Sequence, residues 1–253
     1  MELNFYKYQG TGNDFILLDC RETPSLFKKL CDRHFGIGAD GIVLIQNDDE
    51  YKSDFYMKYY NSDGKESTMC GNGARCAIFF YKKLGINQIH FRAIDGDHNG
   101  FIKDNLVSIN LLNIDKNTIE IHTKHVFLNT GSPHHILFAE NIKEKNVYKE
   151  GKKIRFQSPY LEKGVNVNFV KILENNALQV RTYERGVENE TLSCGTGVVA
   201  SVIAACETNK IEEILVQTLG GKLWVSLTKT KNEYKNVSLT GSVKFIFKGS
   251  ILV

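Results

Sequence analysis

The sequence predicts an α/β protein of the α+β type, with two pseudo-symmetric domains that each wrap a curved sheet around one central helix. A repeated motif, a helical pattern after each copy, and short apolar segments around both carry this prediction. The motif reads Cys70-Gly71-Asn72-Gly73-Ala74 in the first half and Cys194-Gly195-Thr196-Gly197-Val198 in the second. The cysteines lie 194 − 70 = 124 residues apart, close to half of the 253-residue chain. A constant offset of this size indicates a duplicated unit.

Other residues repeat at the same offset and extend the duplication beyond the motif. They are Tyr59 with Tyr183, Glu66 with Glu190, Gly73 with Gly197, and Gly96 with Gly220. We therefore predict one domain over 1–115 and a second over 116–239, divided at the polar stretch 113–117. The alternating segment Val237–Phe247 reads as an edge strand. We expect residues 240–253 to return to the first domain as its final strand.

The central helices are predicted from apolar residues at helical spacing directly after each motif cysteine. In the first half this spacing runs from Ala74 to Leu84, and Gly85 follows as a stop signal. In the second half it runs from Val198 to Cys206. Both segments have little polar surface, which is typical of a helix buried on most sides. A shorter helix is predicted from Pro24, with Thr23 as its N-cap.

Strands are predicted where short apolar runs are bounded by Gly, Asn and Asp. Before the first motif these are Phe15–Leu18, Ile42–Ile45 and Phe55–Tyr60. After the helices they are Ile89–Ala93, Phe101–Leu112, Ile214–Thr218 and Leu223–Thr228. Asp95-Gly96 and Gly220-Gly221 have the composition of hairpin turns. This pattern places one strand-rich layer around each predicted helix.

Bulk composition excludes several classes of function. The chain is 42% hydrophobic and 24% charged, with a formal net charge of +3, as in ordinary soluble proteins. The lysines are scattered and form no basic patch, so we expect no nucleic-acid partner. No apolar run reaches the ~18 residues of a membrane span, and no export signal is visible. We expect a cytoplasmic protein whose six cysteines are thiols.

Each motif cysteine lies where a turn gives way to a helix. The glycines leave backbone N–H groups accessible, and the helix dipole favours negative charge on the sulfur or on a bound carboxylate. A free thiol has a pKa of about 8.5, and a helix N-terminus is worth up to about 2 kcal/mol, which brings the thiol into the range of a general base. The two cysteines are therefore candidate proton-transfer groups.

Two thiolates close to one carbon atom repel each other, so the stable pair at neutral pH is one thiolate and one thiol. That pair suits a stereo-inverting proton transfer, with a base on one face of the carbon and an acid on the other. Such a reaction needs no cofactor, because N–H donors can stabilise the developing negative charge. The sequence has no Cys-x2-Cys pair and no His-x3-His pair, so we expect no metal. Neither motif copy is followed by Lys-Ser/Thr, which argues against a phosphate-binding loop. Cys20, Cys31, Cys76 and Cys206 are interpreted as small buried hydrophobic residues.

Several stretches, in order along the chain, resemble those of the diaminopimelate epimerase family, whose members are cofactor-independent amino-acid epimerases. The run Cys70-Gly71-Asn72-Gly73-Ala74-Arg75-Cys76 is the most distinctive. The others are Gly10–Phe15, Asn61–Gly64, Gly131–His134, Val165–Val167, and Tyr183–Val187 leading to Cys194–Gly197. The resemblance covers nearly the whole chain. It implies two similar domains with the active site in the cleft between them, and the interconversion of LL- and meso-2,6-diaminopimelate for lysine and peptidoglycan precursors.

The resemblance also implies roles for individual residues. Cys70 and Cys194 are the implied acid and base, and His134 and Glu184 the groups that help set their protonation. The implied substrate-binding residues are Asn13, Asn61, Gly71, Asn72, Asn166, Glu184, Arg185, Gly195 and Thr196. Of these, Gly71-Asn72 and Gly195-Thr196 would bind the reacting carboxylate through their backbones. A zwitterionic substrate needs both donors and acceptors, which arginine, glutamate and asparagine supply. The family also implies a homodimer.

Three departures and three alternatives accompany this reading. Gly41 stands where some members of the family have glutamine. Ser132 replaces an asparagine common in the family, which leaves recognition of the distal substrate end open, and His135 stands where a small residue is common. A proline or hydroxyproline racemase-like enzyme would share the two thiols, but the Asn72–Cys76 continuation and Glu184-Arg185 argue against it. A phenazine-biosynthesis type isomerase would lack the cysteine pair. An inactive binding module of the same fold would not need the pair.

Overall fold

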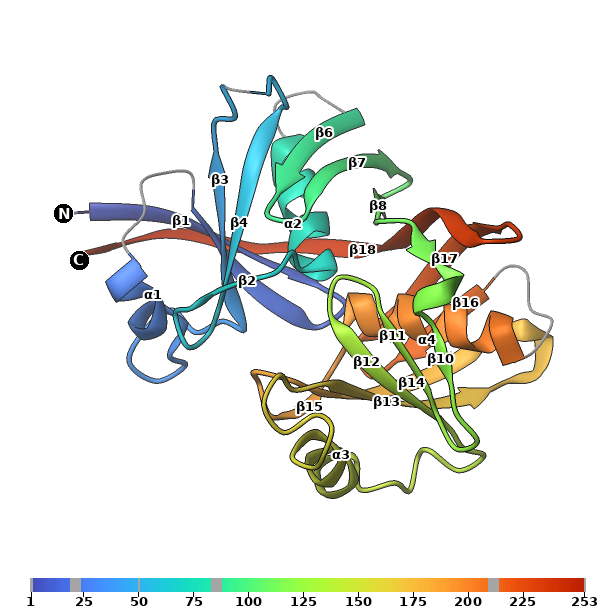
Figure 1. Cartoon of the computed structure of the whole chain (residues 1–253). Helices are drawn as coiled ribbons and strands as arrows, with labels where there is room; N and C mark the ends of the chain where they lie inside the picture. The colour runs from blue at the N-terminus through green and yellow to red at the C-terminus, as the bar shows by residue number, and fades with distance from the viewer. Residues whose placement is uncertain (1, 19–23, 50, 83–87, 209–213, 253) are drawn as a thin grey trace. The chain divides into compact units, whose positions relative to one another are not determined.

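The computed structural model describes residues 2–18, 24–49, 51–82, 88–208 and 214–252. The chain divides into two compact units, Met1–Ile109 with Gly241–Val253, and Asn110–Thr240 (Figure 1). The long strand β18 (Glu233–Leu252) contributes residues to both units. None of the helices in the described ranges is long and apolar enough to cross a membrane.

The first unit is a mixed sheet around helix α2 (Gly71–Tyr81), with α1 (Pro24–Cys31) between its second and third strands. Strand β1 pairs antiparallel with both β18 and β2, and β2 pairs parallel with β3. The sheet continues antiparallel from β3 to β4, parallel from β4 to β6, and antiparallel through β7 and β8. Its strands are β1 (Glu2–Gly10), β2 (Asn13–Leu18), β3 (Gly41–Gln46), β4 (Phe55–Asn61), β5 (Glu66–Ser67), β6 (Gln88–Ala93), β7 (Gly96–Lys103) and β8 (Leu106–Asn110).

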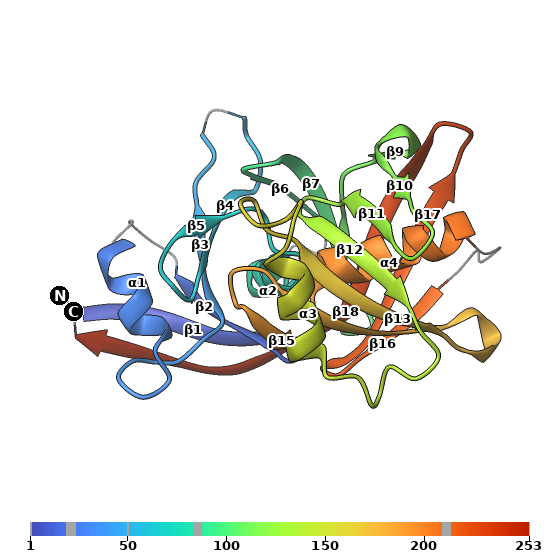
Figure 2. The same ribbon diagram turned by 60° about the horizontal axis from the view of Figure 1, so that its bottom comes forward.

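The second unit repeats this plan around helix α4 (Gly195–Thr208). Strand β11 pairs antiparallel with β12, β12 parallel with β13, and β13 antiparallel with β14. Strand β14 pairs parallel with β16, which pairs antiparallel with β17. The elements are β9 (Ile114–Asp115), η2 (Lys116–Thr118), β10 (Glu120–Ile121), β11 (Val126–Asn129), β12 (Pro133–Phe138), α3 (Val147–Arg155), β13 (Asn166–Ile172), η3 (Glu174–Asn176), β14 (Leu178–Glu184), β15 (Asn189–Thr191), β16 (Ile214–Thr218) and β17 (Gly221–Lys229). Helices α4 and α3 cover opposite faces of this sheet (Figures 1 and 2).

The two units share one topology, and this confirms the predicted fold class. In each unit, a short helix lies in the chain between two strands that pair in parallel. These are α1 between β2 and β3, and α3 between β12 and β13. In each unit, the central helix also lies in the chain between two strands that pair in parallel. These are α2 between β4 and β6, and α4 between β14 and β16. Helix α2 packs on β1, β2 and β7, and α4 packs on β12, β13, β14 and β17.

Burial explains why the central helices have so little polar surface. Every residue of α2 from Gly71 to Ile78 is buried, and so is every residue of α4 from Gly195 to Cys206. A helix surrounded by a sheet must present apolar or hydrogen-bonded side chains on all sides. Arg75 is the exception in α2, because its charged guanidinium lies fully inside the first unit.

Three predicted elements differ from the structure. The segment Phe101–Leu112 was expected as one strand, but β7 ends at Lys103 and β8 begins at Leu106. Asp104 and Asn105 between them have φ of 50° and 63°, which makes a type I′ hairpin turn. The hairpins predicted at Asp95-Gly96 and Gly220-Gly221 turn one residue earlier, because Ala93 pairs with Gly96 and Thr218 with Gly221.

Some predictions fall on residues outside the described ranges. These are the N-cap at Thr23, the helix end at Leu84-Gly85, and the interpretation of Cys20. The described part of the first short helix begins at Pro24, as expected for proline at a first helical position.

Candidate active site

Cys70 is the N-cap residue of α2. Its backbone is extended, with φ −105° and ψ 114°, and its carbonyl oxygen accepts from Ala74 N at 2.7 Å, which closes the first helical turn. The N–H groups of this first turn have no intrahelical acceptor and point out of the helix end. The sulfur therefore lies at the positive end of the α2 dipole, where negative charge is favoured.

A hydrogen-bond network joins Cys70 to the start of β2. Asn13 Oδ1 accepts from Asn72 Nδ2 at 3.2 Å and lies 4.0 Å from Cys70 Sγ. Asn72 Oδ1 in turn accepts from Arg75 Nη2 at 2.7 Å, and the same nitrogen donates to Thr11 Oγ1 at 3.0 Å. Three of the sequence-predicted site residues thus share one network, with a buried guanidinium behind them.

The other end of Asn13 is fixed by charged residues. Asn13 Nδ2 donates to Asp40 Oδ2 at 2.7 Å. Arg33 pairs with Asp40 at 2.8 Å and with Asp14 at 2.7 Å, and Lys7 pairs with Asp14 at 2.7 Å. Burial opposes ionisation of Asp14, but hydrogen bonds from Arg33 and Lys7 outweigh it and lower its pKa to about 2. Asn13 is therefore held by an ion-pair cluster with two positive and two negative members.

Asn61 stands apart from this network. It is the last residue of β4, where its N–H donates to the Lys65 carbonyl at 3.0 Å and its carbonyl accepts from Gly64 N at 2.9 Å. Gly64 has φ of 84°, a conformation that suits glycine and lets the chain reverse at this point. Among the described residues, no recorded hydrogen bond links the Asn61 side chain to Asn13 or Cys70.

Cys194 precedes the first residue of α4 and is 7% exposed. Its carbonyl accepts from Val198 N at 2.9 Å, which matches the Cys70–Ala74 bond in the other unit. Cys194 Sγ lies 3.5 Å from Thr196 Oγ1. The two motif cysteines therefore occupy the same backbone position, but their side chains meet different partners.

His134 connects Thr196 to the interior of the sheet. Its Nε2 lies 3.1 Å from Thr196 Oγ1 and its Nδ1 lies 2.9 Å from Asn168 Oδ1. Asn168 Nδ2 donates to Thr182 Oγ1 at 2.9 Å, so Oδ1 is the acceptor and His134 Nδ1 carries the proton. Complete burial lowers the pKa of His134 to about 4, so the imidazole is neutral at neutral pH.

Asn166, Glu184 and Arg185 form a second group in the same unit. Asn166 lies beside His134 in the parallel pair of β12 and β13, and its Oδ1 accepts from Arg185 N at 2.8 Å. Arg185 Nη1 donates to the Lys163 carbonyl at 2.9 Å. Glu184 Oε2 accepts from Thr191 Oγ1 at 2.7 Å. Glu184 and Arg185 are thus adjacent at the end of β14, and the Asn166 amide holds the backbone of Arg185 there.

Sequence reasoning missed Asn168 and Arg75. Asn168 follows Asn166 by two residues on one strand, so alternation places both on one face, and that spacing was the available signal. In the sequence, Arg75 stands out only as part of a motif. Its counterpart at the offset of 124 residues is Val199. This difference between a charged and an apolar residue is visible in the sequence.

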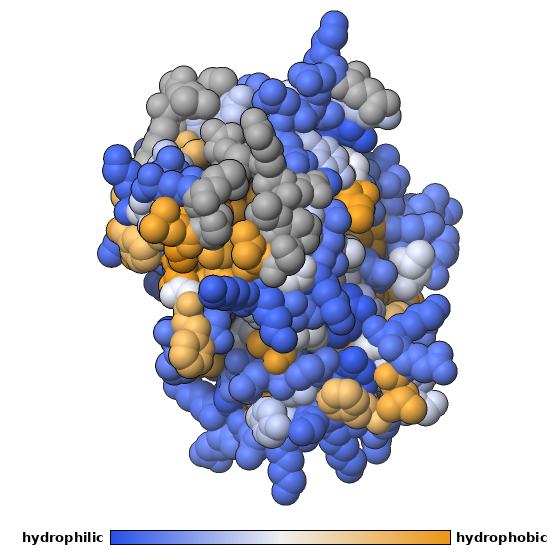
Figure 3. Space-filling model, turned by 90° about the vertical axis from the view of Figure 1, so that its left-hand side faces the viewer, coloured by the Kyte–Doolittle hydropathy of each residue, from blue (hydrophilic) through white to orange (hydrophobic). Residues whose placement is uncertain are grey.

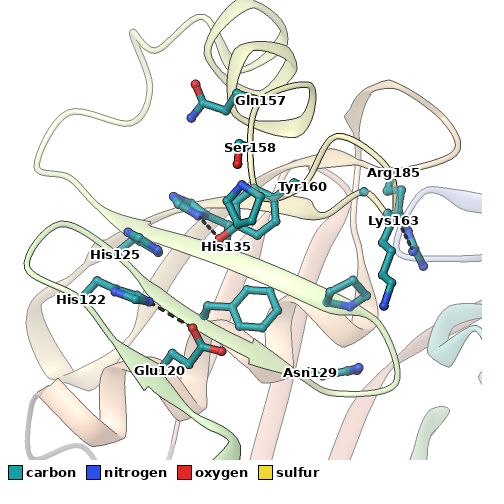
Figure 4. Close-up of a pocket in the computed structure, with 14 residues that line it drawn as sticks. Glu120, His122, His125, Asn129, His135, Gln157, Ser158, Tyr160, Lys163 and Arg185 are labelled. Carbon is teal, nitrogen blue, oxygen red and sulfur yellow. Dashed lines mark hydrogen bonds and ion pairs between the residues drawn. The ribbon is translucent and has the colours of Figure 1, made fainter.

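A pocket of about 690 Å³ in the second unit adjoins Arg185 (Figure 4). The rings of His122, His125 and His135 stack along one wall, with centroids 4.3 and 4.0 Å apart. His135 Nδ1 lies 3.0 Å from Tyr160 Oη, and burial lowers the pKa of His135 to about 4. His134 and His135 thus point to opposite sides of β12, and the bond to Thr196 belongs to His134.

The other described cysteines differ from the motif pair. Burial raises the pKa of Cys31 to about 12 and that of Cys206 to about 11, and it raises that of Cys76 well above its ordinary range. These three remain thiols at neutral pH. The described ranges contain no group of three His, Cys, Asp or Glu side chains that could hold a metal ion.

Known proteins resemble this chain in sequence and in fold. The family model for diaminopimelate epimerase matches residues 5–122 and 126–246. A diaminopimelate epimerase from Flavobacterium psychrophilum is 48% identical over 98% of this chain and 100% of its own length. A phenazine biosynthesis protein from Bacillus anthracis has a TM-score of 0.74 at 14% identity, covering 100% of both chains. A hydroxyproline epimerase from Agrobacterium vitis has a TM-score of 0.74 at 11% identity, covering 99% of this chain and 92% of its own.

The two structural likenesses show the fold, which these proteins share. The sequence match goes further, because it spans both halves and includes both Cys-Gly-Xaa-Gly motifs. The chain belongs to the diaminopimelate epimerase family.

Proposed function

We propose that this protein is a diaminopimelate epimerase that interconverts LL- and meso-2,6-diaminopimelate, in the formation of lysine and peptidoglycan precursors. Family membership supports the substrate. The observation that carries the reaction is the pair of cysteines at equivalent helix starts, each beside a polar network.

In this mechanism one thiolate removes the α-proton and the other thiol donates a proton to the opposite face of the carbon. The sulfur atoms exchange protonation states with each turnover, so product leaves an enzyme with the charge on the other cysteine. The carbanion-like state places negative charge on the α-carboxylate. First-turn N–H groups of α2 and α4 are suited to stabilise that charge, since their helix dipoles add to the hydrogen bonds.

The remaining proposed residues bind the substrate. Arg185 suits a carboxylate and Glu184 an ammonium group, and the two are adjacent at the end of β14. Asn13, Asn61 and Asn166 offer both donors and acceptors without adding charge. His134 acts through Thr196 rather than on the substrate, because two hydrogen bonds hold its buried ring.

The test is epimerisation of LL-diaminopimelate in deuterated water. Deuterium is expected at the inverted α-carbon, and Cys70→Ser and Cys194→Ser should each reduce turnover at least 10²–10⁴-fold, the usual worth of a positioned acid or base. Cys31→Ser is the matched control at a buried thiol. Near wild-type turnover in either motif variant would refute the two-base mechanism. Turnover of L-proline or hydroxyproline instead of diaminopimelate would favour the racemase-like alternative.

The proposal includes a cytoplasmic homodimer, as the family resemblance implies. Apolar side chains gather on part of the face drawn in Figure 3, while hydrophilic ones cover much of the rest. In the first unit, Ile246 and Phe247 of β18 are 45% and 43% exposed, which is apolar area that a second copy would bury. Light scattering should give twice the chain mass of 28.7 kDa, and a single-chain mass at micromolar concentration would contradict the dimer.

A further inference from the structure

We propose that the two thiols are unequal before substrate arrives: the buried charge of Arg75 makes Cys70 the resting thiolate, and the Thr196–His134 hydrogen bond keeps Cys194 as the resting thiol. The mechanistic meaning of this assignment rests on the proposed epimerase function. The charge states themselves are a property of each unit and can be measured without turnover.

Arg75 is a buried cation whose counter-charge is not a carboxylate. Its side chain is 0% exposed, and only Nη2 is bonded, to Thr11 and to Asn72. Among the described residues, Nε and Nη1 have no hydrogen-bond partner, and no ion pair is formed by this guanidinium. A buried charge is costly unless an opposite charge compensates it. The interior of the first unit therefore favours an anion close to Arg75.

The acidic residues nearest to this network are already neutralised. Asp14 and Asp40 are matched by Lys7 and Arg33, two negative charges against two positive ones. This cluster holds Asn13 from its far side, so it fixes the network without balancing Arg75.

The thiols remain as possible counter-charges. Burial lowers the pKa of Arg75 to about 10, and negative charge on Cys76 or Cys70 acts in the opposite direction. Arg75 therefore stays charged at neutral pH. Cys76 is fully buried, and burial raises its pKa well above its ordinary range despite Arg75, so it stays protonated. Cys70, half-buried at the helix end, is the thiol that can ionise in response.

The contact between Cys70 and Asn13 is long. Its sulfur lies 4.0 Å from Asn13 Oδ1, and that oxygen already accepts from Asn72 at 3.2 Å. A hydrogen bond weakens steeply at such distances. The helix dipole is common to both cysteines, so Arg75, the burial of each sulfur and the partners of each sulfur distinguish them.

The second unit has no equivalent of Arg75. The residue at the same offset is Val199, which is buried and uncharged. At the end of β14, Glu184 and the next residue, Arg185, have opposite signs, and His134 is neutral. No lysine or arginine among the described residues of this unit is buried as Arg75 is.

The hydrogen-bond directions in the second unit favour a protonated sulfur. Because His134 Nδ1 donates to Asn168, its Nε2 is an acceptor, and Thr196 Oγ1 must donate its one proton to it. The lone pairs of that oxygen then face Cys194 Sγ at 3.5 Å, so the S–H donates to the hydroxyl. Hydrogen bonding to the neutral form of an acid stabilises that form.

The experiment measures the pH midpoint of iodoacetamide alkylation for each cysteine separately, with fragment-ion mass spectrometry assigning the site. Midpoints are compared rather than rates, because Cys70 and Cys194 differ in exposure. The Cys70 midpoint is expected below that of Cys194. Arg75→Gln should raise the Cys70 midpoint by about one pH unit, a tenfold loss of thiolate at lower pH, and leave Cys194 unmoved. Arg75→Lys keeps the charge and should keep the midpoint.

A second variant tests the other half independently. Thr196→Val removes the hydroxyl but keeps the shape, and it should lower the Cys194 midpoint, because the S–H loses its acceptor. A rise in that midpoint would mean that the hydroxyl donates to a thiolate, and this would overturn the assignment. So would an unchanged Cys70 midpoint in folded Arg75→Gln protein, checked by circular dichroism.

The two proposals fail differently. Shifted midpoints in a protein with no activity on diaminopimelate would retain the charge assignment and refute the proposed substrate. Full epimerase activity with midpoints that ignore Arg75 and Thr196 would retain the function and refute the assignment.

Discussion

Gly197→Ala adds a single methyl group and tests the hydrogen bonds that join Thr196, His134 and Asn168. A Cβ at Gly197 would lie 2.4 Å from Asn168 Nδ2 and 3.2 Å from His134 Cε1. Asn168 has no room to yield, because Thr182 and His134 hold both ends of its amide. The equivalent position in the first half, Gly73, offers a matched control: a Cβ there would come no closer than 3.2 Å, to a methyl group of Val43.

The expected change in the free energy of unfolding is the balance of a stabilising and a destabilising effect. Replacing glycine by alanine inside a helix gains about 1 kcal/mol. At Gly73 this gain is offset by slight overpacking, so the free energy of unfolding should change by less than about 1 kcal/mol. At Gly197, overpacking costs about 1–3 kcal/mol and a broken hydrogen bond about 1 kcal/mol more. The net loss is about 1–3 kcal/mol, which for a chain of this size lowers Tm by about 2–12 °C.

The assay is calorimetric Tm together with kcat for deuterium incorporation. Gly197→Ala should lose both stability and turnover, since displacement of His134 shifts Thr196 away from Cys194. Gly73→Ala should retain both more fully. Equal Tm and equal kcat in the two variants would show that the His134–Asn168 network is not rigid, and the reasoning would be wrong.

Two further predictions concern His134 and Arg185. The pKa of His134 is about 4 in the folded protein and about 6.5 when unfolded, so its neutral form contributes stability at neutral pH that is lost as pH falls from about 6.5 to 4. His134→Gln should flatten that part of a urea-denaturation pH series by up to about 3 kcal/mol, and an unchanged slope would contradict the buried neutral imidazole. Arg185→Lys keeps the charge but loses the planar fork, so KM for diaminopimelate should rise about tenfold with Tm nearly constant. An unchanged KM would remove Arg185 from the substrate site.

Local pattern was enough to predict the central helices and the strands that flank them. Glycines after each cysteine and apolar residues at helical spacing are local signals, and α2 and α4 begin at Gly71 and Gly195. The single strand expected over Phe101–Leu112 failed because apolar residues on both sides of Asp104-Asn105 concealed a two-residue turn. The signal for this turn was the pair Asp104-Asn105 itself, because aspartate and asparagine both tolerate positive φ.

The partners of the site residues were beyond local pattern. His134 meets Asn168 only because β12 and β13 pair in parallel with His134 opposite Asn166, and register between strands 32 residues apart is a tertiary property. The burial of Arg75 was also hidden, since an arginine within a helix is ordinarily exposed. Charge compensation across a domain interior cannot be read from spacing along the chain.

The repeated topology of the two units has a consequence for how such an enzyme arises. A half-length ancestor with one thiol per chain would need two copies to supply a base and an acid, and identical copies give identical thiols. Joining the copies in one gene frees each half to change alone. The contrast between Arg75 and Val199 is a change of that kind, and it is open only to a fused chain. In this scheme duplication supplies the second sulfur, and divergence after fusion allows the two to differ.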